Sequence, residues 1–168
     1  MSRYTIAVLV KNQFGVLNRI TNMFRRRQFN IATINASETE TAELSRITVS
    51  LDGEELYKQQ LINQLYKLPD VCSIKEFTPD NSVSSELLLI KMENDPKSRE
   101  DIASAARAYS AETLDYSKHS LILRLVDTSI RIDDFVNLMR NYKILEISRT
   151  GSASLEKGST TIHQTINI

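Results

Sequence analysis

Hydrophobic and polar positions follow two different periods along the chain, and their order predicts the elements of the fold. Residues 4–10, YTIAVLV, form a short apolar run of β-prone side chains, which indicates a strand buried on both faces. In the next segment, apolar side chains recur at helical spacing, and Arg25–Arg27 close it where cations suit the negative end of a helix dipole. We therefore expect a helix over about residues 15–27.

The remainder of the first half continues the same alternation of strands and helices. FNIATINAS and LSRITVSLD interleave isoleucine and threonine with the period of two that paired strands require, which predicts a hairpin. Residues 54–68 then repeat leucine at helical spacing until Pro69 stops them, and VCSIKEF supplies a last strand. The order β, α, β, β, α, β is that of the ferredoxin-like unit.

The second half repeats this order after a stretch of turn-forming residues. Its elements are ELLLIKME, KSREDIASAARAY, ETLDY, HSLILRLV, RIDDFVNLMRNY and KILEISR. The expected fold class is α+β, with two ferredoxin-like βαββαβ domains in tandem: residues 1–78, a linker at 79–85, and residues 86–168 including a tail. Each sheet carries both helices on one face. The other face must be solvated or covered by a partner sheet or another subunit, and the exposed edge strands also favour a homodimer.

Composition narrows the class of protein further. The 21 basic residues balance the 21 acidic ones, so the charge favours neither nucleic acid nor an anionic membrane as a partner. A single cysteine excludes an intrachain disulfide framework. The N-terminal apolar run is too short for a membrane span and lacks a signal-peptide pattern, so we expect a cytoplasmic protein.

Residues for catalysis or metal binding are not grouped in any familiar pattern. The 4 glycines are too dispersed for a dinucleotide fingerprint or a P-loop. His119 and His163 lack a cysteine or histidine at metal-ligand spacing, and Cys72 lies in an apparently buried strand. We therefore expect no catalytic residues, no metal and no cofactor in this chain. An RNA-binding ferredoxin-like module stays a weaker alternative, because the third strand SRITVSLD carries no aromatic for base stacking.

The stretch NQFGVLNRI, residues 12–20, offers a different kind of site. A helix that begins at Gly15 presents unpaired backbone N–H groups and the positive end of its dipole, which attract a carboxylate. A residue without Cβ lets such a ligand approach closely. Asn12 and Asn30 could hydrogen-bond its polar groups, and Ile31 could line an apolar wall. This combination suits a small amino acid.

Several of these motifs also occur together in a known family. Asn12, Gly15-Val16-Leu17, the pair Arg26-Arg27 followed by Phe29-Asn30-Ile31, and SRTG at residues 148–151 carry the likeness. On them the chain resembles the regulatory, or small, subunit of acetohydroxyacid synthase (acetolactate synthase), whose N-terminal domain is an ACT domain. The resemblance covers nearly the whole chain.

The resemblance implies a non-catalytic partner that activates a large catalytic subunit and confers feedback inhibition by valine or another branched-chain amino acid. Thiamine diphosphate, magnesium and FAD are then expected in the large subunit and none of them in this chain. The implied effector site lies between the ACT domains of a homodimer, with the ligand-binding residues Asn12, Gly15, Val16, Leu17, Asn30 and Ile31. Phe14 and Asn18 depart from the family pattern beside it, and an ACT-type sensor for another biosynthetic enzyme stays open as an alternative.

Overall fold

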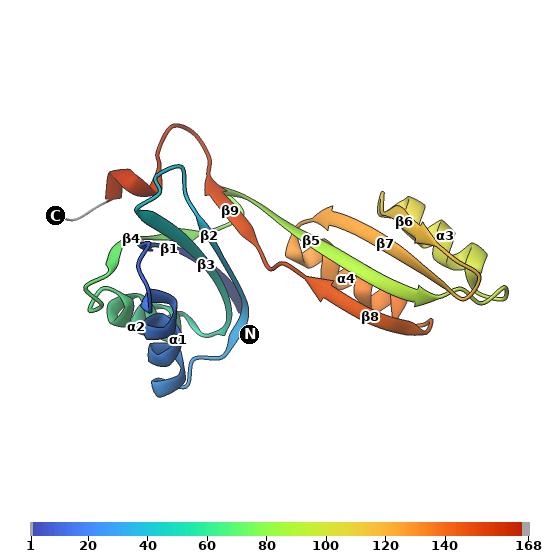
Figure 1. Ribbon diagram of the computed structural model, residues 1–168, viewed down its shortest axis with the longest axis horizontal. Helices are drawn as coiled ribbons and strands as arrows, with labels where there is room; N and C mark the ends of the chain where they lie inside the picture. The colour runs from blue at the N-terminus through green and yellow to red at the C-terminus, as the bar shows by residue number, and fades with distance from the viewer. Residues whose placement is uncertain (1, 166–168) are drawn as a thin grey trace. The chain divides into compact units, whose positions relative to one another are not determined.

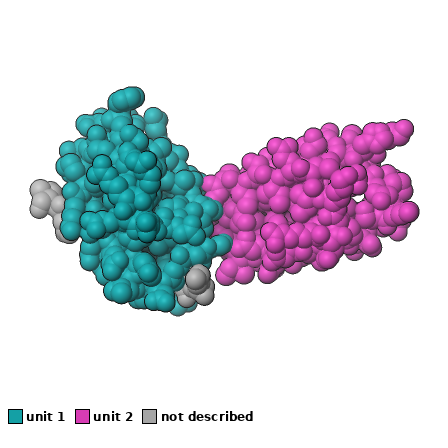
Figure 2. Space-filling model, turned by 90° about the horizontal axis from the view of Figure 1, so that it is seen from below, with its two compact units in different colours: residues 1–83, 152–168 teal, residues 84–151 magenta. Residues whose placement is uncertain are grey.

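The computed structural model describes residues 2–165, which form two compact units. One unit is built from the chain up to Val83 together with the segment from Ser152 onward, and the other spans Ser84–Gly151 (Figure 2). Each unit contains one sheet with two helices packed on it (Figure 1). The two-domain α+β architecture predicted from the periodicity is confirmed.

The first unit has the βαββαβ order of a ferredoxin-like fold. Its sheet has the strand order β2-β3-β1-β4, with antiparallel pairing throughout. The elements are β1 Ser2–Lys11, α1 Val16–Arg26, β2 Ile31–Glu38, β3 Leu44–Gly53, α2 Glu55–Leu65 and β4 Val71–Phe77. The strand β1 is central, and its residues Ile6–Val10 are each at most 1% exposed, as the continuous apolar run predicts.

Both faces of this sheet are covered, but by different parts of the chain. On the helix face, Ile6, Val8 and Val10 pack with α1 and α2 in the main core. On the other face, Ala7 and Leu9 pack against Phe77 and Ile162. Ile162 belongs to a C-terminal segment that contains β9, Ala153–Glu156, and the short helix η1, Ile162–Thr165. Both of these elements contact β4.

This arrangement differs from the expected domain boundary and from the expected cover of the sheet. The sequence predicts that the tail belongs to the second domain, but from Ser152 it groups with the first. Because Ala7 and Leu9 face away from the helices, they gain burial only if another segment covers them, and Ile162 does so without a partner subunit. The predicted linker is also shorter, since β5 already begins at Ser82.

The second unit repeats the same order of elements. They are β5 Ser82–Glu93, α3 Arg99–Ala108, β6 Glu112–Tyr116, β7 Ser120–Asp127, α4 Ser129–Met139 and β8 Ile144–Arg149. The strand order is β6-β7-β5-β8. Alternate residues Leu88, Ile90 and Met92 of β5 point into a core that includes Phe135 of α4.

A buried carboxylate anchors β8 to β5 and α4 in this unit. The side chain of Glu86 is only 1% exposed and accepts a hydrogen bond from Arg149 Nε at 2.5 Å. Arg149 Nη1 also contacts Asp133 Oδ1 at 2.6 Å, and Ser129 Oγ donates to the other Glu86 oxygen at 2.6 Å. The hydrogen bond from Arg149 to Glu86 raises the pKa of Arg149. Removing either partner of such a pair would leave the other charge buried without compensation, which is strongly destabilising.

The start of α4 carries a second polar cluster. The hydroxyl of Thr128 caps the helix by accepting from the Arg131 backbone N–H. Burial opposes ionisation of Asp127, but hydrogen bonds from the Thr128 N–H at 2.7 Å and from Arg131 Nε at 2.6 Å outweigh it. The pKa of Asp127 therefore lies below its usual value of 3.8.

Candidate functional site

Gly15 forms the hinge between β1 and α1 and adopts a conformation that favours glycine. Its φ of 84° and ψ of −5° are left-handed, a region that costs an ordinary L-residue about 1–2 kcal/mol. A Cβ built there would lie 3.6 Å from Arg19 Nη1, an ordinary contact, so backbone conformation rather than crowding selects glycine. No side chain caps the helix that starts at Val16. The Val16 N–H donates to the Gln13 carbonyl at 3.3 Å, which leaves the following N–H groups of the first turn for an external acceptor.

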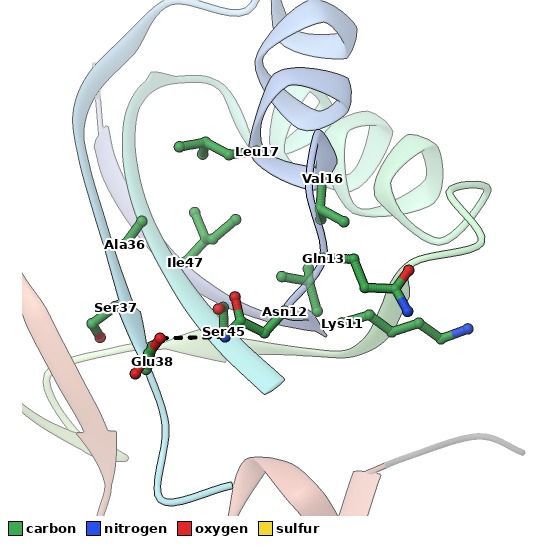
Figure 3. Close-up of a pocket in the computed structure, with 11 residues that line it drawn as sticks. Lys11, Asn12, Gln13, Val16, Leu17, Ala36, Ser37, Glu38, Ser45 and Ile47 are labelled. Carbon is green, nitrogen blue, oxygen red and sulfur yellow. Dashed lines mark hydrogen bonds between the residues drawn. The ribbon is translucent and has the colours of Figure 1, made fainter. Parts of the chain in front are cut away.

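An open cavity of about 270 Å³ lies between this helix start and the edge strand β2 (Figure 3). Its lining combines an apolar floor with a polar rim. The floor consists of Val10, Val16, Leu17, Ala36 and Ile47, and the rim of Lys11, Asn12, Gln13, Ser37, Glu38 and Ser45. Leu17 is 47% exposed, so one apolar side chain of the floor is open to solvent.

Asn12 joins the rim to the β2–β3 hairpin. Its backbone N–H donates to the Glu43 carbonyl at 2.7 Å, and its side-chain Nδ2 donates to the Ala42 carbonyl at 3.0 Å. The same Nδ2 lies 3.4 Å from Glu38 Oε1, the contact dashed in Figure 3. Asn12 is therefore held beside a carboxylate at the mouth of the cavity.

Glu38 is a site residue that the sequence did not reveal. It stands at the head of the acidic run ETETAE, which reads as a solvated loop. The structure instead places it at the end of β2, on the same face as Ala36, because it pairs with Ser45 while Ala36 pairs with Ile47. The two-residue period of the strand, extended by one step, would have indicated this position.

The structure brings together only part of the predicted set within one chain. Asn12, Val16 and Leu17 line the cavity, and Gly15 immediately precedes its helix. Asn30 and Ile31 do not line it, because Ile31 begins β2 and Glu38 ends it. Seven residue steps along a strand separate the two ends by about 23 Å.

The two residues that depart from the family pattern also lie outside the cavity. Phe14 is fully exposed at the β1–α1 turn, and Asn18 accepts a hydrogen bond from Asn22 one turn further along α1. Neither side chain lines the cavity. Within one chain, the size of the cavity is set by the floor residues and not by these two.

Neither a metal-binding cluster nor a membrane-spanning helix occurs in the described part of the chain. Between residues 2 and 165, no three or more His, Cys, Asp or Glu side chains gather as metal ligands would. Across the same residues, no helix has the length and hydropathy needed to cross a membrane.

The fold and the site at the β1–α1 turn define the first unit as an ACT domain. A sequence model of the AHAS small subunit-like ACT domain matches residues 6–73, and a model of the small subunit of acetolactate synthase matches residues 85–158. The chain belongs to the acetolactate synthase small-subunit family.

Individual relatives match over nearly their whole length. A probable acetolactate synthase small subunit of Archaeoglobus fulgidus is 37% identical over 157 residues, covering 94% of this chain and 98% of that relative. The acetolactate synthase small subunit of Bacillus subtilis is 37% identical over 156 residues, covering 92% and 90%. The crystal structure of the acetolactate synthase small subunit from Thermotoga maritima superposes with a TM-score of 0.83 at 28% identity, covering 95% of this chain and 100% of that one.

Proposed function

We propose that this chain is the non-catalytic regulatory subunit of an acetolactate synthase. It binds and activates a large catalytic subunit and confers feedback inhibition by a branched-chain amino acid, with valine as the first candidate. Thiamine diphosphate, magnesium and FAD belong to the large subunit in this proposal. The observation that carries the effector role is the cavity at the start of α1, which combines anion-binding, cation-binding and apolar groups.

The chemistry of the cavity matches the three parts of such an amino acid. The uncapped N-terminus of α1 accommodates the α-carboxylate through backbone N–H groups and the helix dipole. The Glu38 carboxylate at the rim supplies a partner for the ammonium group. Leu17 and Ile47 offer apolar contacts to a branched side chain. The volume of about 270 Å³ is close to the lower limit of small-molecule pockets, which favours a small effector.

A homodimer through β2 would complete the site. β2 is an edge strand of the first sheet, so one side of its backbone is free to pair with another strand. If two copies pair antiparallel about Ile34, Asn30 of one copy lies opposite Glu38 of the other. Asn30 of the second copy then reaches the cavity that it cannot reach in its own chain.

The test of the whole proposal is reconstitution with a separately purified large subunit from the same source. We expect the isolated chain to turn over no pyruvate, to increase acetolactate formation by the large subunit, and to make that formation sensitive to valine. Pyruvate turnover by the chain alone, or no effect on the large subunit, would contradict the proposal.

A pull-down from the source cell distinguishes the alternatives. Copurification with a thiamine-diphosphate enzyme supports the proposal. Copurification with a different biosynthetic enzyme identifies another ACT-type sensor and refutes the assignment of the partner. Recovery of RNA would refute the regulatory role altogether.

A further inference from the structure

A second cavity lies on the opposite face of the ACT sheet, beneath the C-terminal tail. Its volume is about 350 Å³. The sheet contributes Arg46 of β3 with Lys75 and Phe77 of β4, and Glu40 of the β2–β3 loop joins them. The tail contributes the rest of the lining: Leu155, Glu156, Gly158, Thr160, Thr161, Ile162 and His163.

Arg46 has unused capacity to bind an anion in this cavity. It pairs with Leu9 across the sheet, so its side chain shares the face that carries no helices. Its Nη2 donates to the Ser154 carbonyl at 2.5 Å, and its guanidinium lies 5.5 Å from the centre of the Phe77 ring. Burial lowers the pKa of Arg46. Within residues 2–165 it has no carboxylate within 4.0 Å, although a guanidinium offers five N–H donors in a fork that matches a carboxylate.

Within the described residues, the carboxylate of Glu156 has one oxygen without a donor, which could accept from a cation. Its Oε1 pairs with Lys75 Nζ at 2.8 Å. Its Oε2 is buried and accepts no hydrogen bond from any residue that the structure describes. A buried carboxylate oxygen without a donor is destabilising, so a ligand ammonium that donates to it would be favourable. Glu156 and Arg46 both line the cavity, and a small shift of the Glu156 side chain would bring its buried Oε2 within reach of a bound molecule that also contacts Arg46.

Apolar groups complete the description of the ligand. Phe77, Leu155 and Ile162 also line the cavity, and Ile162 packs on the sheet beside Phe77. The remaining charged pair, His163 with Glu40, links the tail to the β2–β3 loop. The ligand must therefore carry a carboxylate, an ammonium group and an apolar side chain within a small volume.

We propose that the cavity beneath the tail binds an apolar α-amino acid as a zwitterion, with its carboxylate on Arg46 and its ammonium on Glu156. This site is distinct from the cavity at α1, which lies on the helix face of the sheet. The bound amino acid contacts both the sheet and the tail and holds the tail in place. The inference does not depend on the proposed effector site.

The experiment measures L-leucine binding to the full-length chain by calorimetry and by the backbone amide resonances of residues 155–163. Gly15→Asp serves as the background, because it removes binding at the α1 cavity if the proposed function is correct. In that background we expect leucine to shift the tail amides. Arg46→Met and Glu156→Gln should each weaken leucine binding by at least about tenfold, whereas Arg25→Met, on the exposed face of α1, should leave it unchanged.

Two leucine analogues test the zwitterion requirement. We expect 4-methylpentanoate, which lacks the ammonium group, and 3-methylbutylamine, which lacks the carboxylate, each to bind at least about tenfold more weakly than leucine. Equal binding of either analogue would refute the assignment of the group that it lacks. Should Arg46→Met fail to fold, as judged by circular dichroism, Glu156→Gln and the analogues still decide the question.

The two proposals fail in different ways. If leucine leaves the tail amides unshifted, or if Glu156→Gln binds it as the parent does, the site beneath the tail is refuted. If Gly15→Asp removes no binding relative to the unsubstituted chain while the tail amides still shift, the effector site at α1 is refuted and the site beneath the tail stands.

Discussion

Gly15→Asp is the sharpest test of the effector site, because it places a carboxylate where the effector's own carboxylate is proposed to bind. Aspartate tolerates the left-handed conformation at φ 84° better than most residues, so the folding penalty stays near 1 kcal/mol. Aspartate is also a preferred N-cap, and its side chain would accept the N–H groups of the first turn. The carboxylate of the effector would then lose both the N–H donors of the first turn of α1 and the favourable electrostatic potential of the helix N-terminus.

The size of the effect follows from these two contributions. Losing a hydrogen bond to a charged group costs about 1.5–3 kcal/mol. Two like charges about 4 Å apart repel by about 1 kcal/mol in water and about 4 kcal/mol at the effective dielectric of a protein surface. A total of about 3 kcal/mol or more corresponds to a loss of valine affinity of roughly a hundredfold.

Gly15→Asn is the matched control, because asparagine caps a helix and tolerates the left-handed region about as well but carries no charge. Calorimetry with valine should therefore rank the affinities as glycine, then asparagine, then aspartate. The gap between the last two should narrow as salt is added, since screening weakens the repulsion. Unchanged valine binding by Gly15→Asp would refute the site, and equal affinities for the two variants at low salt would refute the electrostatic reasoning.

Three further experiments test the dimer and the second unit. Mixing Asn12→Ala chains with Asn30→Ala chains should restore one valine site of full affinity per mixed dimer, measured by calorimetry after subunit exchange; no restoration would show that both asparagines act from the same chain. Arg149→Met should destabilise the chain by about 3–5 kcal/mol in urea unfolding, because it leaves Glu86 buried without its cation, and an unchanged midpoint would contradict that. Since the pKa of Asp127 is lowered on folding, its stabilising contribution is present above about pH 4 and is lost as the pH falls through the folded value. Asp127→Asn should thus differ from the parent in unfolding free energy at pH 6, and the difference should shrink as the pH falls below about 4; a constant difference would refute this.

Helices and strands could be predicted wherever the pattern of apolar side chains persisted along the segment. The helix expected at residues 15–27 is found at Val16–Arg26, because the left-handed Gly15 fixes its start. The apolar run at residues 6–10 is the most buried strand of the first sheet. The helix expected over residues 54–68 ends earlier, at Leu65, since Pro69 sets only an outer limit.

The position of the C-terminal tail could not be predicted from the periodicity of the sequence. From Ser152 to Thr165 the sequence has no apolar period, and only Ile162 contributes a buried hydrophobic side chain. Its position depends on a partner distant in sequence, the Ala7 and Leu9 face of β1, and on pairs such as Lys75 with Glu156. Local pattern carries no information about such contacts, so the tail could not be assigned to a unit from sequence.

The effector site is a second feature that the sequence pattern could predict only in part, and the missing part bears on regulation. A period of two shows which face of β2 a residue occupies but not which end, so Asn12 and Asn30 read as neighbours although their ends of β2 lie about 23 Å apart. If the site takes Asn12 from one copy and Asn30 from another, it exists only in the dimer. Effector binding and dimerisation are then thermodynamically linked, and each must strengthen the other by the same factor. Valine should therefore lower the dimer dissociation constant, whereas a site complete within one chain would leave that constant unchanged.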